Sequence, residues 1–523
     1  MISIERARTI GILILAGIFA AAVPGYAESP SLADRVIEHK LANGMTVLMV
    51  ERHQAPIVSI NMTFGVGDVN EQVGLTGLAH LYEHMAFKGT RTVGTRDHEK
   101  EQAVLDELTT LGNELDRRER EEAARAQMEG KPHVASQEVQ QLQRRFKELQ
   151  EKAGEYVVGN EMALLYQRHG GVGLNASTGK DITRYVISLP ANRLPLWAAL
   201  ESDRMAHPVL REFYKERGVV MEERRLRTDD SPNGLLYETF TSTAFQAHQY
   251  GVPTIGWGSD IMALTPAATE AFFKTYYGPN NATVAIVGDI QPKEVIALIE
   301  QTFGKIPAAP PIPTLVTEEP PQRGERRVEI EFDAEPALAI GYHKPTIGHP
   351  DDFVFDVIDE VLTEGVTSRL YSTLVRDKRL AASVLSDTNY PGVRAPNLFV
   401  IAATPLAPHT TAEVESAIYD ELERLKTEPI SAKEFERVLN GLDADLVRSL
   451  RSNSGLASQL AFYQTVAGTW RYVLNARTRI AAVTPADVQR VASQYLTKPN
   501  RTVGVLVKKA PDKKMAAVGE VAR

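Results

Sequence analysis

Hydrophobic positions after residue 36 alternate between short β-branched runs and longer stretches of helical period. The runs 46–50 and 57–62 are rich in valine and isoleucine and are bounded by polar residues, which predicts two strands. Apolar residues then recur at helical spacing from about 75 to 87. Because strands and helices are mixed along the whole chain, the pattern predicts an α+β fold whose sheets are mostly antiparallel and flanked by helices.

Residues 98–158 interrupt this pattern. They are rich in glutamate, arginine, glutamine and alanine, and only Gly130-Lys131-Pro132 breaks them. A charged sequence of this period predicts two long solvent-facing helices joined by a turn. We therefore expect a helical hairpin inserted into the first domain, with exposed surfaces on most sides.

The chain also predicts a duplication on either side of a proline-rich linker. Six prolines fall between residues 307 and 321, which is typical of a semi-rigid linker. Before it, Thr265-Pro266-Ala267 leads through a helical stretch to Tyr277, Pro279, Asn280 and a strand; after it, Thr484-Pro485-Ala486 leads to Tyr495, Pro499, Asn500 and a strand. The offset is 219 residues at the threonine and 220 at the proline. We expect two homologous domains, 28–306 and 326–523, joined by a linker at 307–325.

The N-terminus has the order of a secretory signal peptide. Arg6 and Arg8 precede an apolar run at 10–23, and Gly25-Tyr26-Ala27 supplies a cleavage site with small outer residues. The run has 14 residues, whereas a membrane span takes roughly 20. We expect residues 1–27 to be removed and the chain to be periplasmic or secreted without a stable membrane anchor; an uncleaved anchor is the alternative.

Composition narrows the chemistry. With 523 residues, 43% hydrophobic and 24% charged, the chain is typical of a folded protein of at least two domains and unlike a disordered or multi-span membrane protein. A net charge of −9 argues against nucleic-acid binding, which requires a basic surface. Cysteine is absent, so any metal ion must be held by histidine, aspartate or glutamate.

The strongest chemical signal is His80-Leu81-Tyr82-Glu83-His84. On a helix, positions i and i+4 share a face, so the two histidines can bind one ion, and Glu83 projects beside it, where it can accept a proton from water. This order inverts the commoner His-Glu-x-x-His and is known among zinc-peptidase motifs. The alternative is an amphipathic helix that carries two surface histidines.

A third protein ligand is expected from the helical segment 212–227. Glu216 and Glu223 lie two turns apart on one face, whereas Glu222 is rotated away from Glu216. We choose Glu223 as the third ligand and Glu216 as a carboxylate that orients a ligand or the water. Taken alone, the segment also fits an ordinary acidic face that pairs with neighbouring arginines.

These motifs, with others along the chain, resemble the insulinase-like (pitrilysin, M16) family of zinc metallopeptidases, which includes the mitochondrial processing peptidase. The matching pieces are Leu41-Ala42-Asn43-Gly44, residues 74–90, Gly173-Leu174-Asn175-Ala176-Ser177-Thr178, residues 216–223, Tyr277-Gly278-Pro279-Asn280-Asn281 and residues 367–379. The resemblance implies one Zn²⁺ per chain held by His80, His84 and Glu223, with Glu83 as general base. It also implies that Asn175 and Ala176 lie on an edge strand that pairs with the substrate backbone.

The chain departs from the family's pattern in two places. The 138 residues between His84 and Glu223 exceed the family's usual spacing by nearly the length of the 98–158 insertion, so the insertion decorates an intact site. Active members use an arginine and, seven residues later, a tyrosine in the second domain to hold substrate. Arg376 fits the arginine, but Ala382 and Ser383 stand where the tyrosine is expected.

The resemblance therefore implies a zinc endopeptidase that hydrolyses peptides or unfolded polypeptides inside a closed chamber, its second domain being non-catalytic. The leader pattern adds that this enzyme is exported. The resemblance also implies a dimer, either of two copies or with a second M16-like subunit that supplies the arginine–tyrosine pair. The alternative is a non-catalytic M16-like subunit that binds or presents substrate to a partner. The intact His-x-x-Glu-His favours the enzyme.

Overall fold

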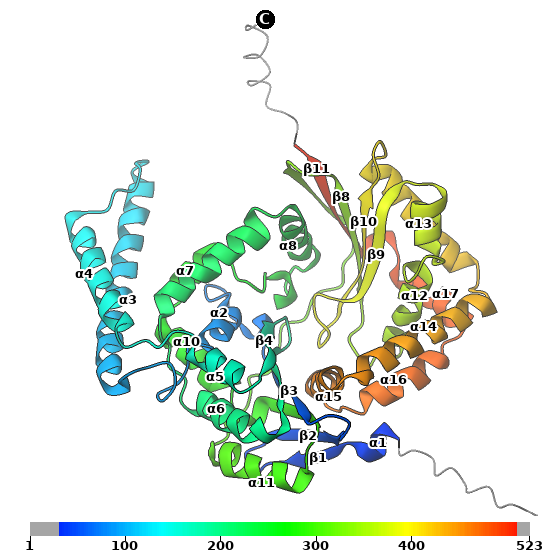
Figure 1. Cartoon of the computed structure of the whole chain (residues 1–523). Helices are drawn as coiled ribbons and strands as arrows, with labels where there is room; N and C mark the ends of the chain where they lie inside the picture. The colour runs from blue at the N-terminus through cyan, green and yellow to red at the C-terminus, as the bar shows by residue number, and fades with distance from the viewer. Residues whose placement is uncertain (1–30, 510–523) are drawn as a thin grey trace, which may run out of the picture.

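Two mixed sheets organise residues 31–509, the part of the chain that the computed structural model describes (Figure 1). The predicted signal peptide, residues 1–27, lies outside these residues. The first half contains β1 (Ile37–Lys40), β2 (Thr46–Glu51), β3 (Ile57–Phe64), β4 (Val172–Thr178), β5 (Thr183–Pro190) and β6 (Ala282–Gly288). Its helices are α1 (Leu32–Arg35), α2 (Leu78–Met85), α3 (His98–Met128), α4 (Gln137–Gly154), α5 (Glu161–Arg168), α6 (Leu194–Ala206), α7 (Phe213–Arg224), α8 (Pro232–Ala244), α9 (Gly258–Ala263), α10 (Pro266–Tyr276) and α11 (Pro292–Thr302).

The second half repeats the design with fewer elements. Its strands are β7 (Arg326–Phe332), β8 (Ala337–Lys344), β9 (Ala381–Tyr390), β10 (Asn397–Pro405) and β11 (Arg501–Lys508). Its helices are α12 (Pro350–Leu362), α13 (Thr411–Thr427), α14 (Ala432–Arg451), α15 (Asn453–Ala467), α16 (Tyr472–Ala481) and α17 (Pro485–Tyr495). Between the halves, residues 307–325 contain no helix or strand, and the domain boundaries drawn there stay predictions.

The strand order is β1-β2-β6-β3-β5-β4 in the first sheet and β7-β11-β8-β10-β9 in the second. Each sheet has one parallel pair, β2 with β6 and β7 with β11, and its other neighbours are antiparallel. Both predictions, an α+β fold and mostly antiparallel sheets, are confirmed. The central strands β3 and β6 are buried along nearly their whole length because both faces of the sheet are covered.

Helix capping explains the repeated sequence. Thr265 and Thr484 cap α10 and α17, each accepting a backbone N–H bond, and a proline at the first helical position fits the fixed φ of a helix start. The asparagine amides of Asn281 and Asn500 donate to the last-turn carbonyls of Tyr276 and Tyr495, at 2.8 and 2.9 Å. The structural offset is therefore 219 throughout, and Asn281, not Asn280, is the counterpart of Asn500.

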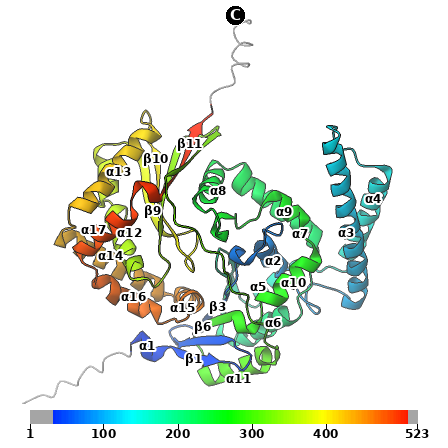
Figure 2. The ribbon, with the colours of Figure 1, turned by 180° about the vertical axis from the view of Figure 1, so that it is seen from behind.

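Each half covers one face of the other half's sheet. Helix α15 of the second half packs on β3 and β6, and α8 of the first half packs on β7, β8 and β11. Both views show α15 beside the first sheet and α8 beside the second (Figures 1 and 2). The buried side chains of these contacts include Leu456, Leu460 and Trp470 on one side and Leu236 and Phe240 on the other. Because the cores are exchanged, we expect the halves to unfold together.

Replacing Phe240 with alanine tests this exchange. The ring is fully buried against β8 and β11, where a Cβ on Gly341 would lie 2.6 Å from Phe240 Cζ, so only glycine leaves room for it. Phe240→Ala should lower the unfolding free energy by about 3–5 kcal/mol and shift one transition for the whole chain in urea. Val316→Ala, at an 82% exposed position, should change it by less than about 0.5 kcal/mol. Two separate transitions, or an unshifted midpoint for Phe240→Ala, would contradict the exchanged core.

The predicted hairpin is confirmed as α3 and α4, but its base is not solvent-facing. The N-terminal part of α3, up to residue 115, buries Glu101, Val104, Leu108 and Leu115, whereas the far end of the hairpin, from 116 to 138, has no buried residue. Glu101 is fully buried beneath Arg211, which precedes α7 and also donates to the carbonyl oxygens of Lys88 and Thr90. The sequence predicted only a charged, exposed surface, because a charged residue in a buried ion pair cannot be distinguished from an exposed one by sequence alone.

No helix within residues 31–509 is long and apolar enough to cross a membrane.

Candidate metal centre

Helix α2 carries the His-x-x-Glu-His motif and is anchored at its N-terminus by a buried carboxylate. The side chain of Glu71 accepts hydrogen bonds from the backbone N–H groups of Gly77 and Ala79, at 2.8 and 2.7 Å. The positive end of a helix favours an anion, although burial raises the pKa of Glu71. Asp260 holds the preceding loop in the same way, accepting from the N–H groups of Gly74 and Thr76 and from the Thr76 hydroxyl.

The structure brings His80, His84 and Glu223 together. One donor atom from each lies within 4.8 Å of the others, with His80 and His84 on α2 and Glu223 on α7. Glu223 Oε2 is 3.7 Å from His80 Nε2 and 3.3 Å from His84 Nε2. Helices α2 and α7 pack directly on each other, so the cluster sits at a helix–helix contact in the first half (Figure 1).

This cluster has the dimensions of a zinc site. Tetrahedral ligands at about 2.0–2.2 Å from Zn²⁺ lie about 3.3–3.6 Å apart, close to the separations of Glu223 Oε2 from the two histidine nitrogens. Burial, then the neighbouring His84, lowers the pKa of His80 to about 4, so this ring is neutral at pH 7 with a lone pair available. Its Nε2 is the nitrogen that faces Glu223, and its Nδ1 is buried with no hydrogen-bond partner among residues 31–509. Two imidazoles and one carboxylate leave a fourth position free for water or substrate.

Glu216 lies behind His84, on the face of α7 that also carries Glu223. Its Oε2 is 3.4 Å from His84 Nδ1, and its other oxygen pairs with Lys88. The hydrogen bond that the ring of His84 donates to Glu216 raises the pKa of His84, and burial opposes this. Burial also opposes ionisation of Glu216, but the bonds to His84 and Lys88 outweigh it and lower the pKa of Glu216. The carboxylate is thus placed to hold the ring of His84.

Glu222 points elsewhere. Its side chain is 56% exposed and pairs with Arg225, whereas Glu223 is 16% exposed. The second oxygen of Glu223 is 2.7 Å from Arg227 Nη1. This arginine leaves Oε2 as the oxygen directed at the histidines, so the geometry favours Glu223 over its neighbour.

Glu83 projects beside the cluster and is held by the edge strand β4. The hydroxyl of Thr178 donates to Glu83 Oε2 at 2.6 Å. Burial raises the pKa of Glu83, and the bond from Thr178 works against that rise. A half-buried carboxylate held in place beside the cluster can accept a proton. Sequence reasoning assigned no role to Thr178, yet it lies two residues after Ala176 and therefore on the same face of the strand.

Asn175 and Ala176 lie where the resemblance implied, on the edge of the first sheet. Within the described part of the chain, strand β4 pairs only with β5, in register Asn175 with Val186 and Ala176 with Tyr185. It also contacts α2. The free edge of β4 therefore runs from the metal cluster outward, which is the arrangement that strand addition by an extended peptide requires.

Arg376 lies on the π-helical segment η7 (Tyr371–Asp377) of the second half, and its guanidinium pairs with Asp377. It is 54% exposed. The residues expected to hold a tyrosine, Ala382 and Ser383, are exposed on β9. Tyr390, the next tyrosine along the chain, is partly buried, and its hydroxyl lies 2.7 Å from the hydroxyl of Thr241.

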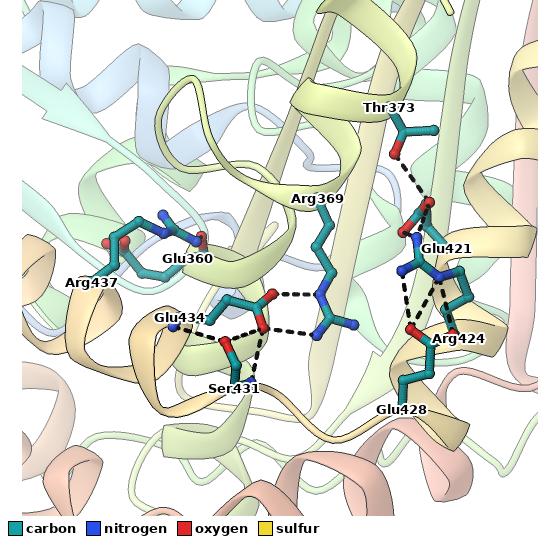
Figure 3. A network of polar contacts seen from close by, with 9 residues as sticks. All are labelled: Glu360, Arg369, Thr373, Glu421, Arg424, Glu428, Ser431, Glu434 and Arg437. Atoms are coloured by element: carbon teal, nitrogen blue, oxygen red, sulfur yellow. Dashed lines mark hydrogen bonds and ion pairs between the residues drawn. The ribbon is translucent and has the colours of Figure 1, made fainter. Parts of the chain in front are cut away.

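A polar network fastens the segment that carries Arg376 to α13 and α14 (Figure 3). Arg369 forms a two-pronged contact with Glu434, which also caps α14 through Ser431, and the hydroxyl of Thr373 donates to Glu421. Burial opposes ionisation of Glu434, but the bonds from Arg369 and Ser431 outweigh it and lower its pKa to about 2. This carboxylate is therefore a stabilising charge.

Glu434→Gln should lower the unfolding free energy at pH 7 by about 1–3 kcal/mol, because a hydrogen-bonded charge is removed. A lowered folded-state pKa stabilises above the unfolded value of about 4.5, and the contribution is lost as the pH falls toward about 2. The difference from wild type should therefore shrink across that range in pH-dependent chemical denaturation. Glu423→Gln, which removes a 68% exposed partner of Lys426, should have an effect below about 1 kcal/mol. A Glu434→Gln difference that stays constant down to pH 2 would contradict the assignment.

Comparisons with known proteins match both halves. A family model described as "Insulinase (Peptidase family M16)" matches residues 46–114, and one described as "Peptidase M16 inactive domain" matches residues 263–442. The chain is 29% identical over 470 residues to the zinc protease PqqE of Helicobacter pylori, covering 88% of this chain and 90% of that protein. It is 22% identical over 475 residues to the probable mitochondrial-processing peptidase subunit beta of Schizosaccharomyces pombe, covering 87% and 88%. The crystal structure of a protease from Helicobacter pylori superposes with a TM-score of 0.74 at 28% identity, covering 90% of this chain and 99% of that one.

Proposed function

Because the chain is an insulinase-like member of peptidase family M16, we propose that it is an exported zinc endopeptidase acting on peptides or unfolded polypeptides in a closed chamber. The observation that carries the proposal is the convergence of His80, His84 and Glu223 within 4.8 Å, with Glu83 beside them. Family membership supports a peptidase. We infer from the residues of this chain that the His-x-x-Glu-His motif binds zinc, and that the protein is exported and encloses its substrate in a chamber.

The residues of the site have separate roles in the proposed hydrolysis. His80, His84 and Glu223 would hold Zn²⁺, which supplies a Lewis acid that polarises the scissile carbonyl and makes water a stronger acid. Glu83 accepts the proton of the attacking water and passes it to the leaving amine. Glu216 keeps the ring of His84 in place, and Lys88 balances its charge.

The edge strand β4 would position the substrate. A peptide that adds to this edge makes backbone hydrogen bonds with Asn175 and Ala176, independent of its side chains. Such binding suits extended or unfolded chains, because a folded substrate has no free strand to offer. Export is supported by the leader pattern in residues 1–27, and a periplasmic or secreted location follows from it.

A second candidate function is a non-catalytic subunit that binds or presents substrate. The exposed Ala382 and Ser383, where a tyrosine is expected, favour incomplete substrate binding by this chain alone. We propose that the chain works as a dimer, either of two copies or with a second M16-like subunit that supplies an arginine–tyrosine pair. Arg376 stays the proposed arginine of this chain.

One assay tests these proposals together. The purified mature chain, stripped with a chelator and restored with Zn²⁺, should lose and regain hydrolysis of an unfolded protein while leaving the folded form of that protein intact. Adding a candidate M16-like partner should raise the rate by about 10²–10³-fold, the effect of restoring one donor to a transition state. Zinc-independent hydrolysis would contradict the enzyme proposal. Full activity that does not change on mixing would contradict the two-subunit proposal.

A further inference from the structure

The turn that follows the edge strand β4 is held by the second half of the chain. This turn, residues 179–182, joins Thr178 to β5, and its side chains Lys180 and Asp181 are only 6% and 5% exposed. Thr178 is the residue whose hydroxyl holds Glu83. The contacts that hold the turn in place therefore affect the orientation of Glu83, the proposed general base.

Asp181 receives its hydrogen bonds from the loop between β9 and β10 in the second half. Its Oδ2 accepts from the backbone N–H groups of Val393 and Arg394, at 2.7 and 3.2 Å. The approach is so close that a Cβ on Gly392 would lie 2.7 Å from that oxygen. Two oriented backbone donors suit a carboxylate and fix it more tightly than a single contact would.

Tyr250 completes the contact from the first half. Its ring is fully buried, and its hydroxyl lies 2.8 and 2.9 Å from the two oxygens of Asp181. The same hydroxyl accepts from the backbone N–H groups of Arg394 and Ala395, both at 3.1 Å. One tyrosine thus joins the carboxylate to the loop, and every polar atom of the contact is satisfied within the protein.

Lys180 fixes the other side of the turn. Its ammonium group is 2.6 Å from Asp68 Oδ2 and also donates to the Val252 carbonyl. The backbone packs closely as well: a Cβ on Gly67 would lie 2.1 Å from the Gly179 carbonyl oxygen. Since Asp68 lies three residues before Glu71, which caps α2, both the helix and the strand of the site are tied to this turn.

We propose that Asp181 is a positioning residue, through which the β9–β10 loop of the second half sets the orientation of Glu83 by way of Thr178. The inference rests on the proposed function and assigns a task to the half that lacks the metal ligands. A misplacement of about 1 Å in a catalytic group is enough to cost about 10²-fold in rate. The loop thus acts on catalysis without touching substrate.

The test is a double-mutant cycle between Asp181 and Thr178. Asp181→Asn places an amide where two backbone donors point, and should lower kcat by about 10–100-fold with KM changed less than threefold and zinc content unchanged. Thr178→Val should lower kcat similarly, and Thr178→Ser should restore it. If Asp181 acts through Thr178, Asp181→Asn should add less than threefold in the Thr178→Val background.

Asp260→Asn is the matched control, because Asp260 also accepts from two backbone N–H groups and one hydroxyl but holds the loop before α2. The factor by which Asp260→Asn lowers kcat should be the same in the wild-type and the Thr178→Val backgrounds, because Asp260 does not act through Thr178. Should Asp181→Asn fail to fold, Tyr250→Phe removes the hydroxyl and keeps the ring, and the same cycle applies.

Hydrogen exchange supplies a readout that does not depend on activity. In the metal-free protein, Asp181→Asn should speed exchange of the backbone N–H groups in 172–183 and leave those of β6 unchanged. Multiplicative effects of Asp181→Asn and Thr178→Val, or a wild-type kcat for Asp181→Asn, would overturn the inference. The proposed function fails separately, if Glu83→Gln keeps full activity.

Discussion

Glu223→Ala is expected to empty the metal site, whereas Glu222→Ala leaves it filled. Glu223 supplies the carboxylate that lies 3.3 Å from His84 Nε2, and without it only two imidazoles remain. Loss of an outer hydrogen-bonding partner of a ligand costs about 10–100-fold in metal affinity, and loss of a ligand should exceed that. The measurement is zinc content after dialysis against a weak competing chelator.

Glu222→Ala is the matched control, since it removes the same side chain one position away, where it is 56% exposed and paired with Arg225. Both variants should keep the wild-type circular dichroism spectrum, because neither side chain packs in the core. An empty site in Glu222→Ala and a filled one in Glu223→Ala would contradict the ligand assignment.

Glu83→Gln is expected to keep zinc and to lose hydrolysis. The amide has the shape of the carboxylate and can still accept the hydrogen bond from Thr178, but it cannot accept a proton from water. General-base catalysis contributes typically about 10²–10⁴-fold, so kcat should fall by that factor. The assay is single-turnover hydrolysis with zinc quantified in the same sample.

Two controls separate this loss from misfolding. The zinc content of Glu83→Gln should equal that of the wild type, and an unfolded substrate should still bind with unchanged affinity, because β4 makes that contact. A Glu83→Gln variant that turns over within threefold of the wild type would show that another group takes the proton.

The sequence predicted those parts of the protein that depend on local spacing. The histidines at i and i+4, the glutamate two turns from Glu216 and the capping pair Thr-Pro at two helix starts are local patterns, and the structure places each on the helix that the pattern predicts. The duplication was also visible, although the register of Asn281 with Asn500 needed the observed hydrogen bonds.

Contacts between distant segments could not be predicted in this way. Thr178 is 95 residues from Glu83, and Asp181 is more than 200 residues from the loop that binds it. Glu101, which pairs with Arg211 in the interior, lies in a segment whose composition indicates only a solvated helix. Such pairs carry no periodic signal, because their partners are joined by the fold and not by the sequence.

The exchange of α8 and α15 between the halves belongs to the same class. The apolar side chains of each helix pack on the sheet of the other half, which lies on the other side of the linker in the sequence. The sequence of one half therefore does not explain why its helix is apolar. A consequence for function is that the second half, which carries none of the proposed metal ligands, is part of the framework of the first.

The most direct test of the central claim is anomalous X-ray diffraction at the zinc edge from crystals of the mature chain. The claim predicts one zinc peak per chain, about 2.0–2.2 Å from His80 Nε2, His84 Nε2 and a Glu223 carboxylate oxygen. A peak at any other group of residues, or a zinc-loaded crystal with no peak between α2 and α7, would contradict it.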